Sequence, residues 1–241
     1  MNVFIVHAHH EPQSFNGAMT ARVTKELEAA GHSVVVSDLH AMGFDPVSDR
    51  RNFTTVAEGD YLKQQREEQH AHENSGFAPD IAGEMDKLDG CDVLIFQYPL
   101  WWFGMPAILK GWVDRVLAMG RMYGGGKWFD SGALSSKRCM VAMTTGGPEP
   151  RYVAPEGYEG LNPPMSAILT PVHHGVFWFT GMRVLEPYIA WSPAHLDADQ
   201  RSNTLDDYAA HLMAQLEQEG AAPPVAAEFP PPTFVRAKAN A

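Results

Sequence analysis

The sequence predicts an α/β fold, with a doubly wound, five-stranded parallel sheet and helices on both of its faces. Short apolar runs of strand length alternate with longer segments in which apolar residues recur at helical spacing. Parallel neighbours in a sheet need a crossover connection, which is usually a helix. The length of 241 residues favours one domain with an appended segment over two full domains.

The chain opens with a strand, a loop and a helix. The apolar run Asn2–Val6 has the length of a strand. A helix begins near Ser14, and Gly31 ends it. The apolar positions of this helix recur at Met19, Val23 and Leu27.

A second strand and a long polar segment follow. Ser33–Ser37 is short and rich in β-branched residues, which is typical of a strand. The chain is irregular and polar from His40 to about Phe77. Within this segment, Tyr61–His72 is polar on nearly all sides, as in a solvated helix, and we assign no chemistry to it.

The middle of the chain repeats the alternation of helix and strand. Asp80–Leu88 predicts a core helix, and the apolar run Val93–Tyr98 predicts a buried strand. Pro106 suits the first position of the next helix, because its missing N–H would be unpaired there anyway. The apolar stripe of that helix consists of Ile108, Leu109, Trp112, Val113 and Val116.

The last elements complete the predicted sheet. Cys139–Met143 and Met182–Ile189 are the fourth and fifth strand candidates, and Ala198–Glu217 is the closing helix. Residues 1–220 therefore form the predicted domain. Residues 221–241 are rich in Ala and Pro, and we expect a tail that wraps a neighbouring surface or remains mobile.

Composition excludes several classes of function. The net charge of −11 and a pI near 5.4 argue against nucleic-acid binding, which needs clustered Lys and Arg. We find neither a signal peptide nor an apolar run long enough to span a bilayer, so we expect a cytoplasmic protein. Cys91 and Cys139 lie beside or inside predicted strands, and we assign them neither a disulfide nor a redox role.

Three loops follow predicted strands and should meet at one edge of the sheet, where such folds bind ligands. They are residues 7–16, 99–104 and 144–147. The first leads into a helix N-terminus, which favours an anion, and Ser14 and Asn16 add polar partners for a phosphate or diphosphate. Alternatively, Ser14 only caps the helix.

The other two loops suit a flat ligand. Trp101, Trp102 and Phe103 would expose three adjacent aromatic rings unless a planar ring stacks on them, although one indole could instead fill a gap between helix and sheet. Residues 144–147 (TTGG) bring hydroxyls and a side-chain-free backbone to the same edge, which suits close approach of a heteroaromatic ring. Alone, such a sequence is only a turn.

The stretches HAHHEPQSFNG, FQYPLWWFGMPAILKGWVDRV and TTGG, in this order, resemble the NAD(P)H:quinone oxidoreductases related to DT-diaphorase. The resemblance runs from Asn2 to roughly Gln218. It implies a flavodoxin-like fold, tightly bound FAD, and a homodimer with the active site at the subunit interface. It also implies ping-pong, two-electron transfer from NADH or NADPH to a quinone or another flat acceptor.

The resemblance also implies roles for individual residues. Those near the FAD diphosphate and adenosine are His9, Ser14, Phe15, Asn16 and Arg201. Those bordering the isoalloxazine ring are Pro99, Leu100, Trp102 and Phe103, and those at its polar edge are Thr144, Thr145, Gly146, Gly147 and Tyr152. The substrate slot would consist of Trp102, Phe103, Tyr123 and, from the second subunit, Phe179. The catalytic set would be Tyr152, Tyr158 and Gly146.

The chain departs from the family pattern at several positions. Gly125 replaces a second tyrosine of the slot, and Tyr158 replaces a histidine that assists the flavin-contacting tyrosine. His174 matches a metal-binding histidine of a paralogous relative, but the second such histidine falls on Trp178, so we expect no metal at His173 and His174. The alternatives are a flavodoxin-like electron carrier, a regulatory or ancillary subunit, and an azo or nitro reductase.

Overall fold

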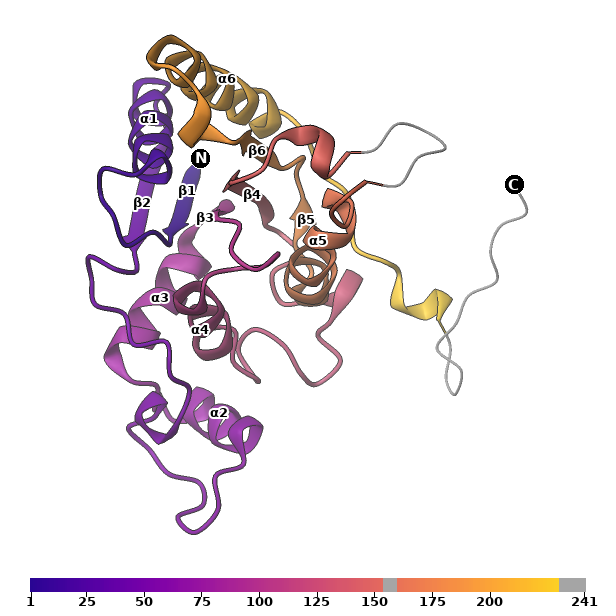
Figure 1. The fold of residues 1–241 in the computed structure, drawn as a ribbon. Helices are drawn as coiled ribbons and strands as arrows, with labels where there is room; N and C mark the ends of the chain where they lie inside the picture. The colour runs from indigo at the N-terminus through magenta and orange to yellow at the C-terminus, as the bar shows by residue number, and fades with distance from the viewer. Residues whose placement is uncertain (154–159, 230–241) are drawn as a thin grey trace.

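The computed structural model describes residues 1–153 and 160–229 and contains a parallel sheet between two layers of helices (Figure 1). The strands are β1 (Asn2–His7), β2 (Ser33–Asp38), β3 (Val93–Pro99), β4 (Arg138–Thr145), β5 (Arg183–Val184) and β6 (Tyr188–Trp191). The α-helices are α1 (Phe15–Ala29), α2 (Gln64–Glu73), α3 (Pro79–Gly90), α4 (Ala107–Val116), α5 (Met165–Val172) and α6 (Ala198–Leu216). The strand order is β2-β1-β3-β4-β5, which confirms the predicted fold class.

The predicted fifth strand is two short strands. Both β5 and β6 pair in parallel with β4, one at each end of it. Leu185, Glu186 and Pro187 separate them, and Pro187 has no N–H to donate to a neighbouring strand. The main-chain N–H of Glu186 instead donates to the side chain of Gln215 in α6, at 3.0 Å.

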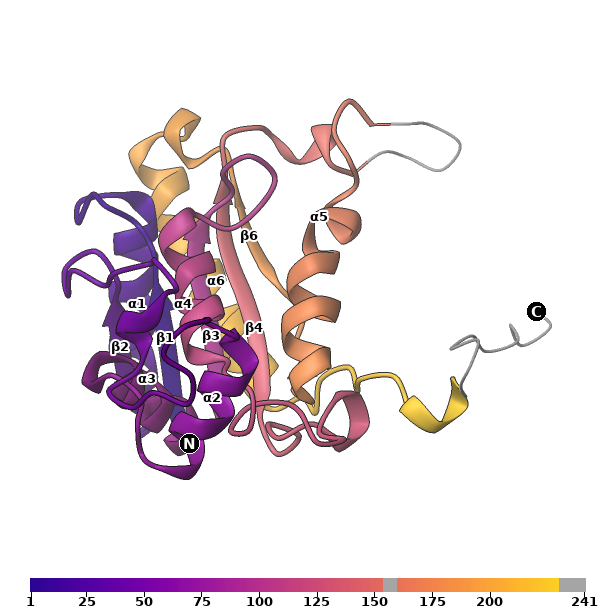
Figure 2. The same cartoon turned by 90° about the horizontal axis from the view of Figure 1, so that it is seen from below.

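Each face of the sheet has its own core. Helices α1 and α6 cover one face, where the predicted Met19, Val23 and Leu27 are buried with residues of α6. Helices α3, α4 and α5 pack against the other face, and Figure 2 shows the sheet from another side with α5 beside β4 and β6. The seven residues of β3 are all buried, as expected for a strand between two layers.

Three helices differ from the sequence-based prediction. Pro106 is the N-cap of α4 rather than its first residue. Helix α5 was not predicted, although its buried Met165, Ile168, Leu169 and Val172 have helical spacing. It continues into a π-helix at His173–Trp178. Helix α2 is not a fully solvated helix, because Glu67 and Glu68 are only 1% and 4% exposed.

The segment after α6 returns to the domain. Ala221 pairs with Val184 of β5 and accepts a hydrogen bond from the indole N–H of Trp178 at 3.2 Å. The N–H of Ala226 donates to the carboxylate of Asp130 at 2.8 Å. Residues 230–241 lie outside the described part of the chain. No helix within the described residues is long and apolar enough to span a membrane.

Candidate active site

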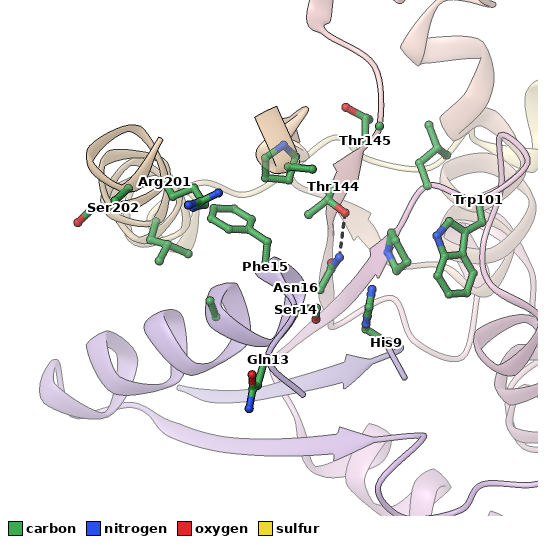
Figure 3. A pocket seen from close by; sticks show the side chains of 18 residues that line it. His9, Gln13, Ser14, Phe15, Asn16, Trp101, Thr144, Thr145, Arg201 and Ser202 are labelled. Carbon is green, nitrogen blue, oxygen red and sulfur yellow. Dashed lines mark hydrogen bonds between the residues drawn. The ribbon is translucent and has the colours of Figure 1, made fainter. Parts of the chain in front are cut away.

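A cavity of ≈ 850 Å³ lies where the three predicted loops meet, at the carboxyl ends of β1, β3 and β4 (Figure 3). The N-terminal part of α6 forms another part of its wall. The predicted cofactor-binding residues that line the cavity are His9, Ser14, Phe15, Asn16, Pro99, Leu100, Thr144, Thr145, Gly146 and Arg201. Gln13 and Trp101, which lie in two of the predicted loops, also line the cavity, as do Pro193 and Ser202, which the sequence did not indicate. The last two lie on either side of the start of α6, where the prediction assigned Arg201 alone to the site.

The N-terminus of α1 presents unpaired donors to this cavity. The Ser14 hydroxyl accepts a hydrogen bond from the N–H of Gly17 at 3.1 Å, so Ser14 caps the helix and also lines the cavity. Within the described residues, the amides of Phe15 and Asn16 have no hydrogen-bond acceptor. Gly17 is required here, because a side chain would collide with the carbonyl oxygen of Pro12. The arrangement suits an anionic ligand group.

A buried hydrogen-bond network supports the floor of the site. Asn16 donates from Nδ2 to Oγ1 of Thr144 at 2.8 Å, and its Oδ1 accepts from Nε2 of Gln97 at 2.9 Å. These contacts join the first loop to β3 and β4. The side chain of Asn16 therefore links the start of α1 to β3 and β4, while its main-chain N–H is one of the free amides at the N-terminus of α1.

The turn after β4 is open on one side and packed on the other. A Cβ added at Gly146 would meet nothing within 4 Å, so the backbone there is accessible to a ligand. Thr145 donates from its hydroxyl to the carbonyl of Gly147 at 2.8 Å, which tightens the turn. Tyr152 is 7% exposed, and its ring lies 5.5 Å from that of Trp191.

The three aromatic residues after β3 face different ways. Trp101 and Gly104 exchange two backbone hydrogen bonds, of 3.2 and 3.0 Å. The residues between them, Trp102 and Phe103, have φ values of 52° and 56°, as in a type I′ turn. Trp101 lines the cavity, whereas Trp102 is 100% exposed and Phe103 48% exposed. Bulky side chains are disfavoured at positive φ, so this turn keeps two aromatic rings in solvent at an energetic cost.

The ring of His9 lies beside the same cavity, and its Nδ1 has a main-chain donor. Its Nδ1 accepts a hydrogen bond from the N–H of Glu11 at 3.0 Å, so the neutral ring carries its proton on Nε2. Its ring stacks on that of His10, with centroids 4.9 Å apart. Burial, followed by the neighbouring His10, lowers the pKa of His9.

Tyr123 and Phe179 lie together in a different place. Their ring centroids are 5.8 Å apart, and both residues line a second cavity of ≈ 480 Å³ that shares no lining residue with the first. Within one chain they are thus separate from Trp101 and from residues 144–146. Tyr158 lies outside the described residues.

His173 and His174 lie against aromatic rings of the same π-helical segment. The His173 ring stacks on that of Phe177 at 6.1 Å, and His174 lies 5.7 Å from the ring of Trp178. Residues 1–153 and 160–229 contain no group of three or more His, Cys, Asp or Glu side chains that could hold a metal ion.

Comparisons with known proteins agree with this architecture. A family model described as a flavodoxin-like fold matches residues 1–216. Ribosyldihydronicotinamide dehydrogenase [quinone] from Pongo abelii is 36% identical over 90% of this chain and 93% of its own length. NAD(P)H dehydrogenase [quinone] 1 from Rattus norvegicus is 37% identical over 89% and 77%. A crystal structure from Klebsiella pneumoniae, assigned as a quinone reductase, is 35% identical with a TM-score of 0.86, covering 92% of this chain and 86% of that one.

Proposed function

The chain belongs to the flavodoxin-like family that includes the NAD(P)H dehydrogenases [quinone], and from this premise we propose that it is an FAD-dependent NAD(P)H:quinone oxidoreductase acting as a homodimer. The observation that carries the proposal is the cavity at the strand ends. It joins an anion-favouring helix N-terminus to an open, polar turn beside Trp101. Its volume of ≈ 850 Å³ is in the range of roughly 300–1,000 Å³ that is typical of ligand pockets.

The extent of the cavity favours FAD over FMN. The N-terminus of α1 is the natural place for the first phosphate, because its free amides point there. The cavity continues beyond it to Arg201 and Ser202 of α6. FMN ends at its phosphate, whereas FAD has a second phosphate and an adenosine to place in that extension. Arg201 is suited to the second phosphate, since a guanidinium binds phosphate oxygens in pairs.

Residues 144–147 and Trp101 would hold the flavin ring. When bound, the flavin supplies hydride transfer from the nicotinamide to the acceptor. The chain contributes placement: the backbone at Gly146 approaches the polar edge of the ring, and Trp101 closes the side of the cavity. Tyr152 follows this turn, and we propose that its phenol stabilises negative charge at that edge.

A second copy of the chain would complete the substrate slot. The exposed rings of Trp102 and Phe103 and the pair Tyr123 and Phe179 belong to regions of one chain that do not share a cavity. The contact between Tyr123 and Phe179 means that both residues would come from the same subunit. Two-fold pairing would bring this pair to the flavin site of the other subunit, and such pairing is the commonest oligomeric form.

The test begins with the cofactor released from denatured protein, which should be FAD by chromatography. Arg201→Ala should weaken FAD binding by about tenfold and leave FMN binding unchanged, because only FAD reaches α6. Initial rates with NADH and a quinone should give parallel double-reciprocal lines, since both flat substrates use one slot in turn. Protein without flavin that also fails to take it up, or a fully active monomer, would contradict the proposal.

A further inference from the structure

Helix α2 carries two adjacent buried glutamates with different partners. Glu67 accepts hydrogen bonds from the main-chain N–H groups of Ala57 at 2.7 Å and Glu58 at 2.9 Å. Glu68 instead faces the turn that contains Tyr123. A buried carboxylate is costly unless it is paired with donors. The contacts of Glu67 therefore fix the loop at Ala57 and Glu58, and those of Glu68 fix the turn that contains Tyr123.

Glu68 contacts both ends of the turn formed by residues 119–123, which we call the Tyr123 turn. Its Oε2 accepts from the N–H of Met119 at 2.7 Å and lies 3.4 Å from the Tyr123 hydroxyl. The turn is closed by a hydrogen bond of 2.8 Å from the N–H of Gly120 to the carbonyl of Tyr123. Oε1 of Glu68 accepts from the side-chain amide of Gln64 at 2.7 Å. Burial raises the pKa of Glu68, against the lowering effect of these donors.

Gln64, Glu68 and Tyr123 line the cavity of ≈ 480 Å³ that Phe179 also lines. A carboxylate has no proton to give, so the Tyr123 hydroxyl directs its own proton to Glu68. Its oxygen lone pairs then remain for other donors. The side-chain amide of Gln65 already approaches this oxygen, with Nε2 at 3.4 Å. An amide N–H is therefore the kind of group that this phenol is arranged to meet.

We infer that Glu68 is a positioning residue that turns Tyr123 into a hydrogen-bond acceptor for the carboxamide of the nicotinamide substrate. The inference rests on the proposed function and refines it. A carboxamide can donate to the Tyr123 oxygen, whereas a quinone offers only carbonyl acceptors. Glu68 thus favours the nicotinamide over the quinone in a slot that both would share.

The test compares Glu68→Gln with Glu67→Gln, a matched change at the next and equally buried position of the same helix. Glu68→Gln should raise the Kd for NAD⁺, measured by calorimetry, and the KM for NADH by about tenfold, while the KM for 1,4-naphthoquinone does not rise. Glu67→Gln should lower the urea midpoint of unfolding but leave all three constants unchanged. Tyr123→Phe should reproduce the tenfold loss for NAD⁺, and the double variant Glu68→Gln/Tyr123→Phe should lose no more than either single variant.

Equal increases for NADH and naphthoquinone in Glu68→Gln, or losses that add in the double variant, would overturn the inference and leave Glu68 a structural residue. Tyr123→Phe keeps the test decisive should Glu68→Gln fold poorly, because unchanged NAD⁺ binding in that variant also overturns it. A parent protein that binds flavin and NAD⁺ but does not reduce quinones would refute the proposed function, while the NAD⁺ affinities would still decide the role of Glu68.

Discussion

The ring of Tyr152 lies beside Gly147, so that a Cβ added at Gly147 would lie 3.3 Å from the Tyr152 hydroxyl. This contact ties the phenol to the turn that follows β4. The ring of Trp191 also lies beside Tyr152, with the two ring centroids 5.5 Å apart. A buried ring in contact with such neighbours has little rotamer freedom, which is the property that a preorganised hydrogen-bond donor needs.

The first prediction concerns the Tyr152 hydroxyl. Tyr152→Phe should slow reduction of the bound flavin by NADH roughly ten- to a hundredfold, because a hydrogen bond to developing charge contributes about 1–3 kcal/mol. The ring and its packing are kept, so the FAD content should stay close to that of the parent. Stopped-flow absorbance measures the rate. An unchanged rate would make Tyr152 a packing residue.

The second prediction concerns the space that Gly147 leaves for this ring. In Gly147→Ala the new methyl group would lie 3.2 Å from the flexible side chain of Arg151 and 3.3 Å from the Tyr152 ring, so both must shift by a few tenths of an ångström. Flavin reduction should slow in the same direction as in Tyr152→Phe. Gly147→Ala combined with Tyr152→Phe should show little further loss, because both changes act through one hydroxyl. Fully additive losses would show that the two residues act separately.

The third prediction concerns the strained turn at Trp102 and Phe103. Replacing this pair with Asn and Gly, which tolerate positive φ, should raise the free energy of unfolding by roughly 1–2 kcal/mol. Trp102 is 100% exposed, so little buried surface is lost in the monomer. Quinone reduction should fall at least tenfold, because the slot loses two of its rings. Urea unfolding and steady-state rates measure the two effects, and retention of full activity would remove these rings from the site.

The fourth prediction concerns His173 and pH. Burial lowers the pKa of His173 to about 4, from its ordinary value of 6.5. Between these two values the unfolded chain binds a proton that the folded chain does not, so the free energy of unfolding should fall as the pH falls. The slope should be roughly 1 kcal/mol per pH unit or less, because the side chain is only partly buried.

His173→Phe tests this effect, because a phenyl ring can still stack on Phe177 but does not titrate. Urea unfolding at about pH 5 and about pH 7.5 should give a smaller difference in the variant than in the parent. His174→Phe, which removes an exposed imidazole at the next position, is the control and should keep the parent's difference. The same difference in parent and His173→Phe would assign the pH dependence to other groups.

The local pattern of apolar and polar residues was sufficient to predict the main helices and strands of this protein. The buried positions Met19, Val23 and Leu27 of α1 and the continuous apolar run of β3 follow from periodicity, because burial on one helix face or on both faces of a strand leaves a direct mark on sequence. Parallel topology then places the strand-end loops at one edge. The positions of Ser14 and of residues 144–146 in a common cavity were predictable for that reason.

Tertiary contacts determined the burial of polar residues and the directions of side chains in turns, which neither hydrophobic periodicity nor composition encodes. Glu67 and Glu68 are buried because distant main-chain donors at Ala57 and Met119 pair with them, and no local pattern marks such partners. In the same way, the hydrogen bonds between Trp101 and Gly104 determine that Trp101 faces the cavity while Trp102 faces solvent. Side-chain direction in a turn depends on a few backbone dihedrals, so the sequence alone predicted an aromatic loop but not which ring lines the cavity.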